Sequence, residues 1–266
     1  MLDRFDWDAY WRWEIFRRGC DPLDFRRWKR DSAHALRGMY PGVPGALVLD
    51  STAGLGDHTV ILAEEGFRVE ACDRSAVALD ATRQAVAAAG LSVEVFEARW
   101  ETLGAQRPGR YDLVFNDALH WIYDPSEMHA ALCGLRAALR PGGALVYFFA
   151  DGRTPEPGAG LRVLDWDWGR TERAELAWDH VRDGTSVALS VVSERGPDWI
   201  DQHHLYLVRA GDAPARLESL TMRRVYRWDW HALTAALERA GFQGMRSEAY
   251  LNVKGHTFAL NRAFAV

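Results

Sequence analysis

The chain has 266 residues, of which 48% are hydrophobic, and this length supports one large α/β core with an elaboration. A formal net charge of −5 argues against binding of nucleic acid over a wide surface, because such binding needs a concentrated cationic face. The three cysteines fit neither a disulfide framework nor a metal site, so a reducing cytoplasm is expected. No apolar run approaches the ~18 residues of a membrane span.

Residues 5–40 carry aromatic and aliphatic side chains at helical spacing, interrupted by the turn signal Asp21-Pro22. We expect two or three helices that form a lid over residues 1–44. The basic cluster at 26–30 indicates the solvated face of one amphipathic helix, and an anion site is the alternative.

From Ala46 the chain alternates strands with helices, which is typical of a mostly parallel sheet joined by crossovers. In chain order the predicted segments are the strand ALVLD, the helix HTVILAEEG, the strand RVEACD, the helix SAVALDATRQAVAAAG, the strands LSVEVFEA and YDLVFND, a helix over 126–139 and, after the turn Pro141-Gly142-Gly143, the strand ALVYFF. We therefore expect a doubly wound, Rossmann-like α/β core over residues 45–161.

Between 162 and 226 the hydrophobic period becomes two, in RAELAWDHV, TSVALSVVSE and DQHHLYLVRA. This pattern predicts an antiparallel β insertion, which either covers the site or pairs subunits. Residues 227–266 then supply a helix, TAALERAGF, and a closing hairpin with strands near 245–252 and 257–264. The hairpin completes a seven-stranded sheet whose last strand is antiparallel.

The strongest local signal is VLDSTAGLGDHT, in which Gly54 and Gly56 make the turn from the first strand into the first helix. Glycine tolerates positive φ and has no Cβ, so a ligand lies against peptide N–H donors at the helix start. Asp73 ends the second strand nineteen residues after Gly54, where a carboxylate accepts both ribose hydroxyls of an adenosine. The spacing predicts a nucleoside cofactor, although a G-x-G turn alone is equally compatible with a structural role.

Two residues favour a methyl donor over a dinucleotide. Thr59 stands where a pyrophosphate-binding motif has its third glycine, and Asp50 would repel a pyrophosphate. The same acid suits the ammonium group of a methionine moiety, directly or through water. We therefore expect S-adenosylmethionine as the cofactor and S-adenosylhomocysteine as its product, with NAD as the alternative. His58 is expected to cap the helix start or to touch the cofactor carboxylate.

Three stretches, VLDSTAGLGDHTVILAEEGFRVEACDRS, EARWETL and NDALH, resemble the class I methyltransferases, and within them the glycine and sarcosine N-methyltransferases. The likeness covers roughly residues 46–150. It implies that Asp73 holds the ribose and that Arg99 and Trp100 flank the adenine. It also implies that Asn116 and His120 line the sulfonium end.

The sequence departs from that family after the fifth strand. The family's carboxylate-binding arginine falls there, whereas this chain reads FFADGR, with Arg153 about three residues late and Asp151 nearer to the expected place. An acid repels a carboxylate, so an amine without a carboxylate, or a larger metabolite, is expected in place of glycine. Tyr226 falls where the family has a substrate-facing tyrosine.

Methyl transfer needs alignment and exclusion of water more than strong acids or bases. His120 is the candidate base for a hydroxyl acceptor, with a purely hydrogen-bonding histidine as the alternative, and Tyr226 is the second catalytic candidate. Aromatic faces attract a sulfonium or a methylated ammonium, but each ring alone is also compatible with a role in the core. No catalytic metal is expected, because His203 and His204 are adjacent on a strand and point to opposite faces.

These considerations define two sets of candidates. The predicted cofactor-binding residues are Asp50, Thr52, Gly54, Gly56, His58, Asp73, Arg74, Arg99, Trp100, Asn116 and His120. The predicted substrate-binding residues are Tyr10, Trp11, Trp13, Asp117, Trp121, Arg153 and Tyr226.

The expected function is methylation of a small molecule, with an amine nitrogen as the leading acceptor and oxygen or carbon as alternatives. A nucleic-acid or protein methyltransferase would favour N-P-P-Y or D-P-P-Y after the fourth strand, which residues 116–119 do not match. A cofactor-binding assembly or regulatory subunit without transfer activity is the other alternative. The resemblance implies a homodimer or higher homo-oligomer, and neither nucleic acid nor membrane is expected as a partner.

Overall fold

The larger of two β-sheets forms the centre of the protein. The computed structural model describes residues 5–20, 26–39, 45–122, 124–149, 172–195, 200–224, 230–253 and 256–266. The strands of the larger sheet are β1 (Leu47–Asp50), β2 (Arg68–Asp73), β3 (Glu94–Glu97), β4 (Tyr111–Asn116), β5 (Leu139–Phe149), β10 (Phe242–Val253) and β11 (His256–Ala265). Their order across the sheet is β10-β11-β5-β4-β1-β2-β3.

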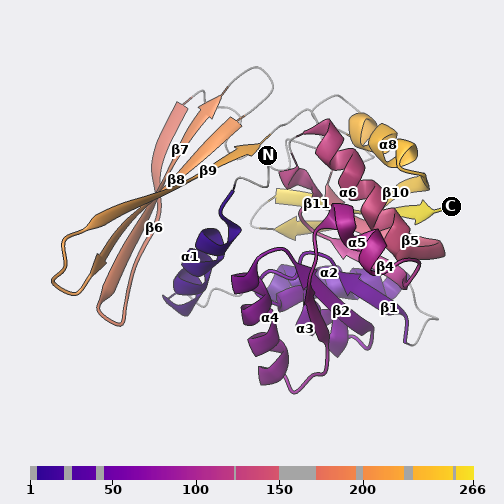
Figure 1. The fold of residues 1–266 in the computed structure, drawn as a ribbon, viewed down its shortest axis with the longest axis horizontal. Coiled ribbons are helices and arrows are strands. Elements are labelled where there is room, and N and C mark those ends of the chain that lie inside the picture. Colours follow the sequence, from indigo (N-terminus) through magenta and orange to yellow (C-terminus); the bar gives the residue numbers. More distant parts are fainter. Residues whose placement is uncertain are drawn as a thin grey trace.

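Strand directions in this sheet follow the predicted pattern. β1 pairs in parallel with β2 and β4, β2 pairs in parallel with β3, and β4 pairs in parallel with β5. β11 is antiparallel to both of its neighbours, β5 and β10. The predicted Rossmann-like sheet of seven strands with a closing antiparallel hairpin is confirmed (Figure 1).

Helices pack on both faces of this sheet. They are α2 (Arg26–Met39), α3 (Asp57–Glu64), α4 (Ala76–Ala88), α5 (Trp100–Gln106), α6 (Pro125–Ala138) and α8 (Trp230–Arg239), together with the 3₁₀ helix η2 (Leu119–Trp121). One apolar core joins the sheet to α5, α6 and α8, and a second core joins it to α2 and α3. Local signals fix helix starts, because the Ser75 hydroxyl caps α4 and the Asp124 carboxylate caps α6.

Helix α5 is an element that the sequence pattern does not predict. It has only seven residues, and its position depends on close packing against α6. A Cβ on Gly134 would lie 2.0 Å from the carbonyl oxygen of Trp100, and a Cβ on Gly104 would lie 2.4 Å from the Cβ of Ala137. These two glycines therefore let the helix backbones approach and set the position of Trp100.

The turn predicted at Pro141-Gly142-Gly143 lies inside β5. Tyr111 of β4 pairs with Leu139, whereas Leu113, two residues later, pairs with Ala144. The three turn residues therefore form an irregularity between paired positions, with a φ of 75° at Gly142, and pairing resumes immediately after them.

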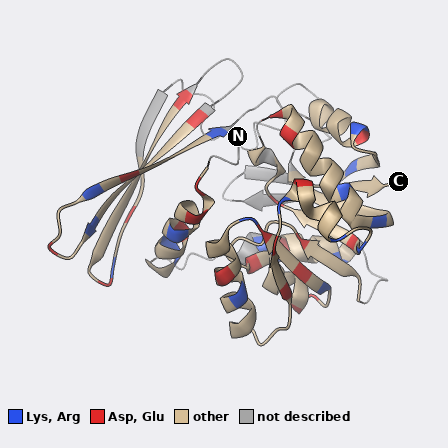
Figure 2. Cartoon of the chain, viewed as in Figure 1, with Lys and Arg blue, Asp and Glu red and all other residues tan. Residues whose placement is uncertain are grey.

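Charges of both signs are mixed over the described surface, as Figure 2 shows for one view. Exposed pairs such as Arg83 with Asp80, 2.8 Å apart on α4, are typical of this surface. Such pairs contribute little stability, because water screens them. Among the helices described, none combines the length and the apolar character that a bilayer crossing requires.

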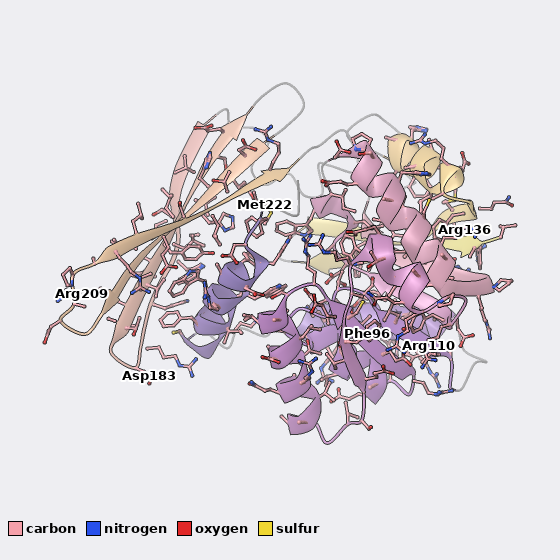
Figure 3. The ribbon with its side chains drawn as sticks, in the orientation of Figure 1. Phe96, Arg110, Arg136, Asp183, Arg209 and Met222 are labelled. Atoms are coloured by element: carbon pink, nitrogen blue, oxygen red, sulfur yellow. The ribbon has the colours of Figure 1, made fainter. Side chains whose placement is uncertain are left out.

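A separate antiparallel sheet follows residues 150–171, which lie outside the described part of the chain. Its strands are β6 (Glu172–Arg182), β7 (Thr185–Arg195), β8 (Ile200–Ala210) and β9 (Arg216–Arg224), paired in chain order. The sequence patterns predict β6, β7 and β8, and β9 is an additional strand. Asp183 and Gly184 have φ values of 48° and 74°, as the tight hairpin turn at the end far from the larger sheet requires (Figure 3).

Helix α1 (Trp7–Cys20) lies between the two sheets (Figure 1). The smaller sheet turns an apolar face toward it, where the Trp13 ring stacks on Tyr206 with centroids 5.4 Å apart. On the opposite face of that sheet, Leu207 and Leu217 are paired neighbours and are 51% and 65% exposed. The predicted lid thus exists as helices, and the insertion supports α1 from outside. The predicted domain limits and the homo-oligomer stay predictions.

Candidate active site

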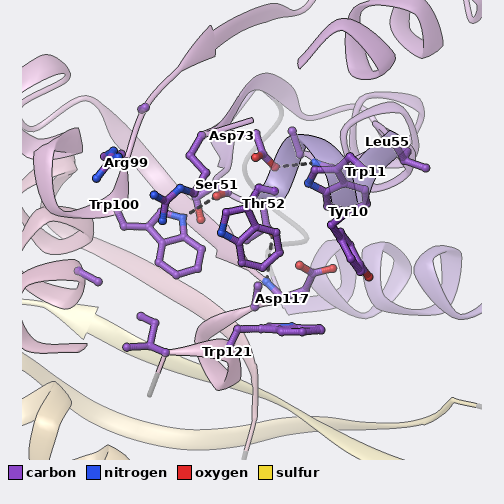
Figure 4. Close-up of a pocket in the computed structure, with 18 of the residues that line it drawn as sticks. Tyr10, Trp11, Ser51, Thr52, Leu55, Asp73, Arg99, Trp100, Asp117 and Trp121 are labelled. Carbon is purple, nitrogen blue, oxygen red and sulfur yellow. Dashed lines mark hydrogen bonds between the residues drawn. The ribbon is translucent and has the colours of Figure 1, made fainter. Parts of the chain in front are cut away.

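A cavity of about 430 Å³ opens where β1, β2 and β4 end, beneath helix α1. Open parallel sheets bind their ligands at this edge. Figure 4 shows side chains from the strand ends facing side chains from α1. The predicted residues that line the cavity are Tyr10, Trp11, Thr52, Gly54, Asp73, Arg74, Arg99, Trp100, Asp117 and Trp121.

The glycine turn after β1 brings the main chain to the cavity wall. Gly54 has a φ of +54°, in the left-handed region, and a Cβ there would lie 2.9 Å from the ring of Trp11. Gly56 has a φ of +82°, and a Cβ on it would lie 3.0 Å from the Cα of Thr82 in α4. Gly54 therefore lines the cavity, whereas Gly56, which is not a lining residue, allows α3 to pack against α4.

Asp73 at the end of β2 has a fixed carboxylate. Its Oδ2 accepts from the N–H of Gly54 and its Oδ1 accepts from the N–H of Ser75, both at 3.0 Å. Burial raises the pKa of this carboxyl from 3.8 to about 6, although these N–H bonds act in the opposite direction. The side chain lines the cavity, as a ribose-binding acid must.

The tryptophan and arginine that follow β3 form one end of the cavity. The Nε1 of Trp100 donates to the carbonyl oxygen of Ser51 at 2.7 Å, which holds the indole against the end of β1. Arg99 is the N-terminal cap residue of α5, and its guanidinium lies 3.6 Å from Glu101. Arg74 lines the cavity beside Asp73.

Asp50 lies behind the cavity wall. It is fully buried, accepts from the Thr59 hydroxyl at 2.7 Å and from the N–H of Thr52 at 3.2 Å, and is not a lining residue. Burial raises the pKa of its carboxyl, and the nearby His58 acts in the opposite direction. The sequence points to Asp50 as a partner for an ammonium group, but the carboxylate on the wall of the described cavity beyond β4 is Asp117.

His58 and Asn116 lie in the same buried layer. His58 does not cap α3, because the N-terminal cap residue is Gly56 and that end has no side-chain cap bond, so this part of the prediction is wrong. Its ring instead lies between Asp117 and Ser32. The amide of Asn116 donates to the Ser51 hydroxyl at 3.0 Å and accepts from the N–H of Ala118 at 2.9 Å. Neither side chain lines the cavity.

Aromatic rings from two distant segments meet over the cavity. Tyr10 of α1 and Trp121 of η2 have ring centroids 6.5 Å apart, and the Trp7 ring lies 6.0 Å from that of Trp121. Trp13 points the other way, because its ring stacks on β8 and its Nε1 donates to Glu218 of β9 at 3.2 Å. The structure therefore divides the predicted α1 residues between the cavity and the insertion.

Two cations that sequence reasoning missed also line the cavity. Lys29 and Arg18 both form ion pairs with Asp57 in the first turn of α3. Burial alone would raise the pKa of Asp57, but these two cations outweigh it and lower the pKa. Only 14% of the Lys29 side chain is exposed, so this member of the basic cluster faces inward, whereas Arg30 is 58% exposed. Helical periodicity relative to Ala33 and Leu36 is the signal that would have identified Lys29.

Some candidates lie outside the described residues. These are Arg153 and Tyr226, and the side chain of His120, whose main chain belongs to η2. Other lining residues that the sequence did not single out, such as Ser51 and Trp7, contribute a carbonyl contact and an aromatic ring. Over the described part of the chain, no group of three or more His, Cys, Asp or Glu side chains is placed to hold a metal ion.

The fold and the cavity together indicate the class of protein. A sheet of this order, with a glycine turn after β1 and an acid at the end of β2, is the fold of class I S-adenosylmethionine-dependent methyltransferases. Residues 48–143 match the family described as methyltransferase domain. This stretch is therefore a methyltransferase domain, and the cofactor that it uses is S-adenosylmethionine. The predictions of the enzyme class and of the cofactor are confirmed at this level.

Individual relatives share the domain or the fold. A tRNA 5-carboxymethoxyuridine methyltransferase of Escherichia coli is 33% identical over 105 residues, which are 38% of this chain and 39% of the relative. The match thus spans about two fifths of the length of that curated relative. A structure of an S-adenosylmethionine-dependent methyltransferase from Clostridium acetobutylicum superposes with a TM-score of 0.69 at 13% identity, over 97% of this chain and 100% of that one. An amino pentose methyltransferase from Micromonospora echinaspora, with the donor bound, superposes with a TM-score of 0.63 at 22% identity, over 96% of each chain.

Proposed function

We propose that the protein transfers a methyl group from S-adenosylmethionine to a nitrogen of a small-molecule amine. The observation that carries this proposal is the cavity. It is lined on one side by Gly54 and Asp73 at the strand ends and on the other by the aromatic rings of Tyr10 and Trp11 from α1. Its volume of about 430 Å³ falls within the roughly 300–1,000 Å³ that is usual for small-molecule sites.

The residues present fit the donor. In this proposal the Asp73 carboxylate accepts from the ribose hydroxyls, and Trp100 and Arg99 flank the adenine. The absence of a Cβ at Gly54 lets the Trp11 ring pack directly over the main chain of the turn, since a Cβ there would lie 2.9 Å from that ring. Thr52 and Asp117 follow β1 and β4 and are bonded to each other, since the N–H of Asp117 donates to the Thr52 hydroxyl at 3.2 Å. Both residues line the cavity.

The chain's own part in the reaction is alignment and exclusion of water. When bound, S-adenosylmethionine supplies a methyl group on a sulfonium sulfur, which leaves as a neutral thioether. Tyr10 and Trp121 present ring surfaces that attract a sulfonium or an ammonium by about 0.5–2 kcal/mol. Helix α1 covers the cavity and keeps the reacting atoms from water. An amine needs only to lose one proton before it attacks, whereas a hydroxyl acceptor requires a base, for which His120 stays the proposal.

The charge of the cavity favours an amine over a carboxylate acceptor. Asp117 on the inner wall is an acid and repels an anionic acceptor, whereas the other lining acid Glu14 is paired with Arg17. Among the lining cations, Lys29 and Arg18 are paired with Asp57, Arg99 lies 3.6 Å from Glu101, and Arg74 lies beside Asp73. The mixture of charge signs among the described residues in the view of Figure 2 and the net charge of −5 support a small molecule over a polynucleotide.

A panel of acceptors tests this proposal. The protein is incubated with methyl-labelled S-adenosylmethionine and, separately, with amino sugars, simple amines, phenols, amino acids and tRNA, and the products are identified by mass. We expect label on an amine nitrogen. Label on oxygen or carbon would select those alternatives, label on tRNA would replace the small-molecule proposal with the activity named for the curated relative, and donor binding without any transfer would select the role of an inactive subunit. The amino sugars are included because one structural relative is named as a sugar N-methyltransferase and another as an amino pentose methyltransferase.

A further inference from the structure

A carboxylate, an imidazole and a hydroxyl form a buried chain from the cavity to helix α2. Asp117 Oδ2 lies 3.3 Å from His58 Nδ1, and His58 Nε2 lies 3.1 Å from Ser32 Oγ. His58 and Ser32 are 2% and 0% exposed, whereas the Asp117 side chain is 21% exposed and lines the cavity. The carboxylate is therefore the end of this chain that meets a ligand.

The contacts of Ser32 and His58 hold the imidazole ring in one orientation. The Ser32 hydroxyl donates to the carbonyl oxygen of Lys29 at 2.7 Å, which holds that hydroxyl beside His58 Nε2. His58 Nδ1 faces the Asp117 carboxylate, which only accepts hydrogen bonds when it is ionised, so Nδ1 donates to it. Asp50 of β1 is a second buried acid near His58.

The carboxylate of Asp117 stays ionised in this setting. Burial would raise its pKa, but the hydrogen bond and the charge of His58, together with the charge of Lys29, lower that pKa well below the usual range. A carboxylate has about four acceptor positions, and His58 and Thr52 occupy only some of them. The remaining acceptor capacity faces the cavity, where Figure 4 shows the carboxylate between Tyr10 and Trp121.

We propose that Asp117 binds an alkylammonium group in the cavity and that His58, anchored by Ser32, is a positioning residue that orients the Asp117 carboxylate. The inference deepens the proposed function and rests on it, because the reaction offers two alkylammonium groups. One belongs to the amino-acid end of the methyl donor, and the other is the acceptor amine before it loses its proton. An aromatic surround strengthens the attraction for either.

Three nucleosides that differ in their charged groups test which group of the donor Asp117 binds. S-adenosylhomocysteine has an ammonium and a carboxylate, its decarboxylated form has the ammonium alone, and methylthioadenosine has neither. Their dissociation constants are measured by quenching of tryptophan fluorescence. If the donor supplies the ammonium, Asp117→Asn weakens the decarboxylated nucleoside by about 10–100-fold, the range expected for one charge-assisted hydrogen bond, and leaves methylthioadenosine within about threefold.

The acceptor arm uses tetramethylammonium as a probe on the protein saturated with S-adenosylhomocysteine, with the uncharged tert-butyl alcohol for comparison. If the ammonium belongs to the acceptor, Asp117→Asn weakens tetramethylammonium by about tenfold or more and changes no nucleoside constant. Unchanged binding of both the decarboxylated nucleoside and tetramethylammonium in this variant overturns the inference.

The positioning role of His58 needs its own comparison. His58→Gln removes the imidazole ring, and we expect about tenfold weaker binding of whichever probe Asp117→Asn affects. Ser32→Ala removes only the anchor of that ring, and we expect about threefold weaker binding of the same probe. His34→Gln, on the exposed side of the same helix as Ser32, is the matched control and leaves all constants unchanged. A purely structural role would instead weaken methylthioadenosine as much as the charged probes and would refute positioning.

The two proposals fail in different ways. If the wild-type protein methylates no amine, the proposed function fails, whatever Asp117→Asn does to the probes. If amines are methylated while Asp117→Asn binds every probe as the wild type does, the ammonium assignment fails and the proposed function stands.

Discussion

The two sides of the cavity are built by different means. The core side uses main chain and short side chains at adjacent strand ends, such as the Gly54 N–H on Asp73 and the Trp100 indole on Ser51. The lid side uses large rings of helix α1, which is not part of the sheet that carries the strand ends. That helix is positioned from outside by Trp13 on Tyr206 and from inside by the Asp8 carboxylate, which accepts from the Ser75 hydroxyl at 2.5 Å.

We therefore expect the core side to determine how tightly the donor binds and the lid side to determine how well the cavity is enclosed. In the proposed function, a change on the core side removes a side chain that contacts the donor directly. A change on the lid side acts indirectly, because it moves α1 while the strand ends on the core side stay in place. Substitutions on the two sides should therefore affect different measured constants.

The largest expected effect lies on the core side, at Asp73. Asp73→Ala removes the two charge-assisted hydrogen bonds that we propose to the ribose, so we expect S-adenosylhomocysteine binding to weaken by about 2–4 kcal/mol. The dissociation constant is measured by isothermal titration calorimetry. Asp80→Ala, an exposed acid on α4, is the control and leaves it unchanged. Unchanged affinity in Asp73→Ala would refute the ribose assignment.

The second prediction concerns the close contact between α5 and α6. Gly134→Ala places a methyl group against the carbonyl of Trp100, so we expect destabilisation by about 1–3 kcal/mol and weaker donor binding as the indole shifts. Denaturant unfolding and fluorescence quenching measure the two effects. Gly38→Ala, on α2 with nothing near its Cβ position, is the helix-glycine control and should leave stability equal or slightly higher. Wild-type stability in Gly134→Ala would show that α5 adjusts freely.

A change on the lid side should spare the donor. Trp13→Ala removes the stack on Tyr206 and the bond to Glu218, at a cost of about 1–2 kcal/mol in stability. We expect the KM of the acceptor to rise more than the dissociation constant of S-adenosylhomocysteine. Ile15→Ala, a more exposed position on the same helix, serves for comparison. Equal losses for donor and acceptor would contradict the division between the two sides.

The smallest effect is a pH dependence that sharpens the role of Asp73. Because the pKa of Asp73 is raised to about 6, the carboxylate that we propose as the ribose acceptor becomes protonated as pH falls through that value. Donor affinity should be constant above about pH 7 and fall by up to about tenfold per pH unit below 6. In the donor-free protein the sign reverses: the folded state binds more protons than the unfolded chain between pH 4 and 6, so this group lowers stability as pH rises there. Asp73→Asn should remove both dependences.

The sequence predicted the elements whose signals are local. Period-two strands, helices ending at glycines and the nineteen-residue spacing from Gly54 to Asp73 all depend on neighbouring residues, and the structure contains them. It missed α5, because seven residues carry too little periodicity and their position depends on Gly134 in another helix. It also attributed the cluster around Lys29 to a solvated face, since nothing local reveals the partner Asp57.

By itself the amino-acid sequence determined the parallel sheet, the glycine turn and the acid that follows β2, because hydrophobic period and backbone sterics act over a few residues. Only the tertiary structure decided that Asp50 is enclosed while Asp117 faces the cavity, and that Tyr10 and Trp13 of one helix serve opposite sides. Those outcomes depend on contacts between segments that are far apart in the chain. Such contacts determine which side chains are buried and which charges are paired, and local sequence patterns do not reveal them.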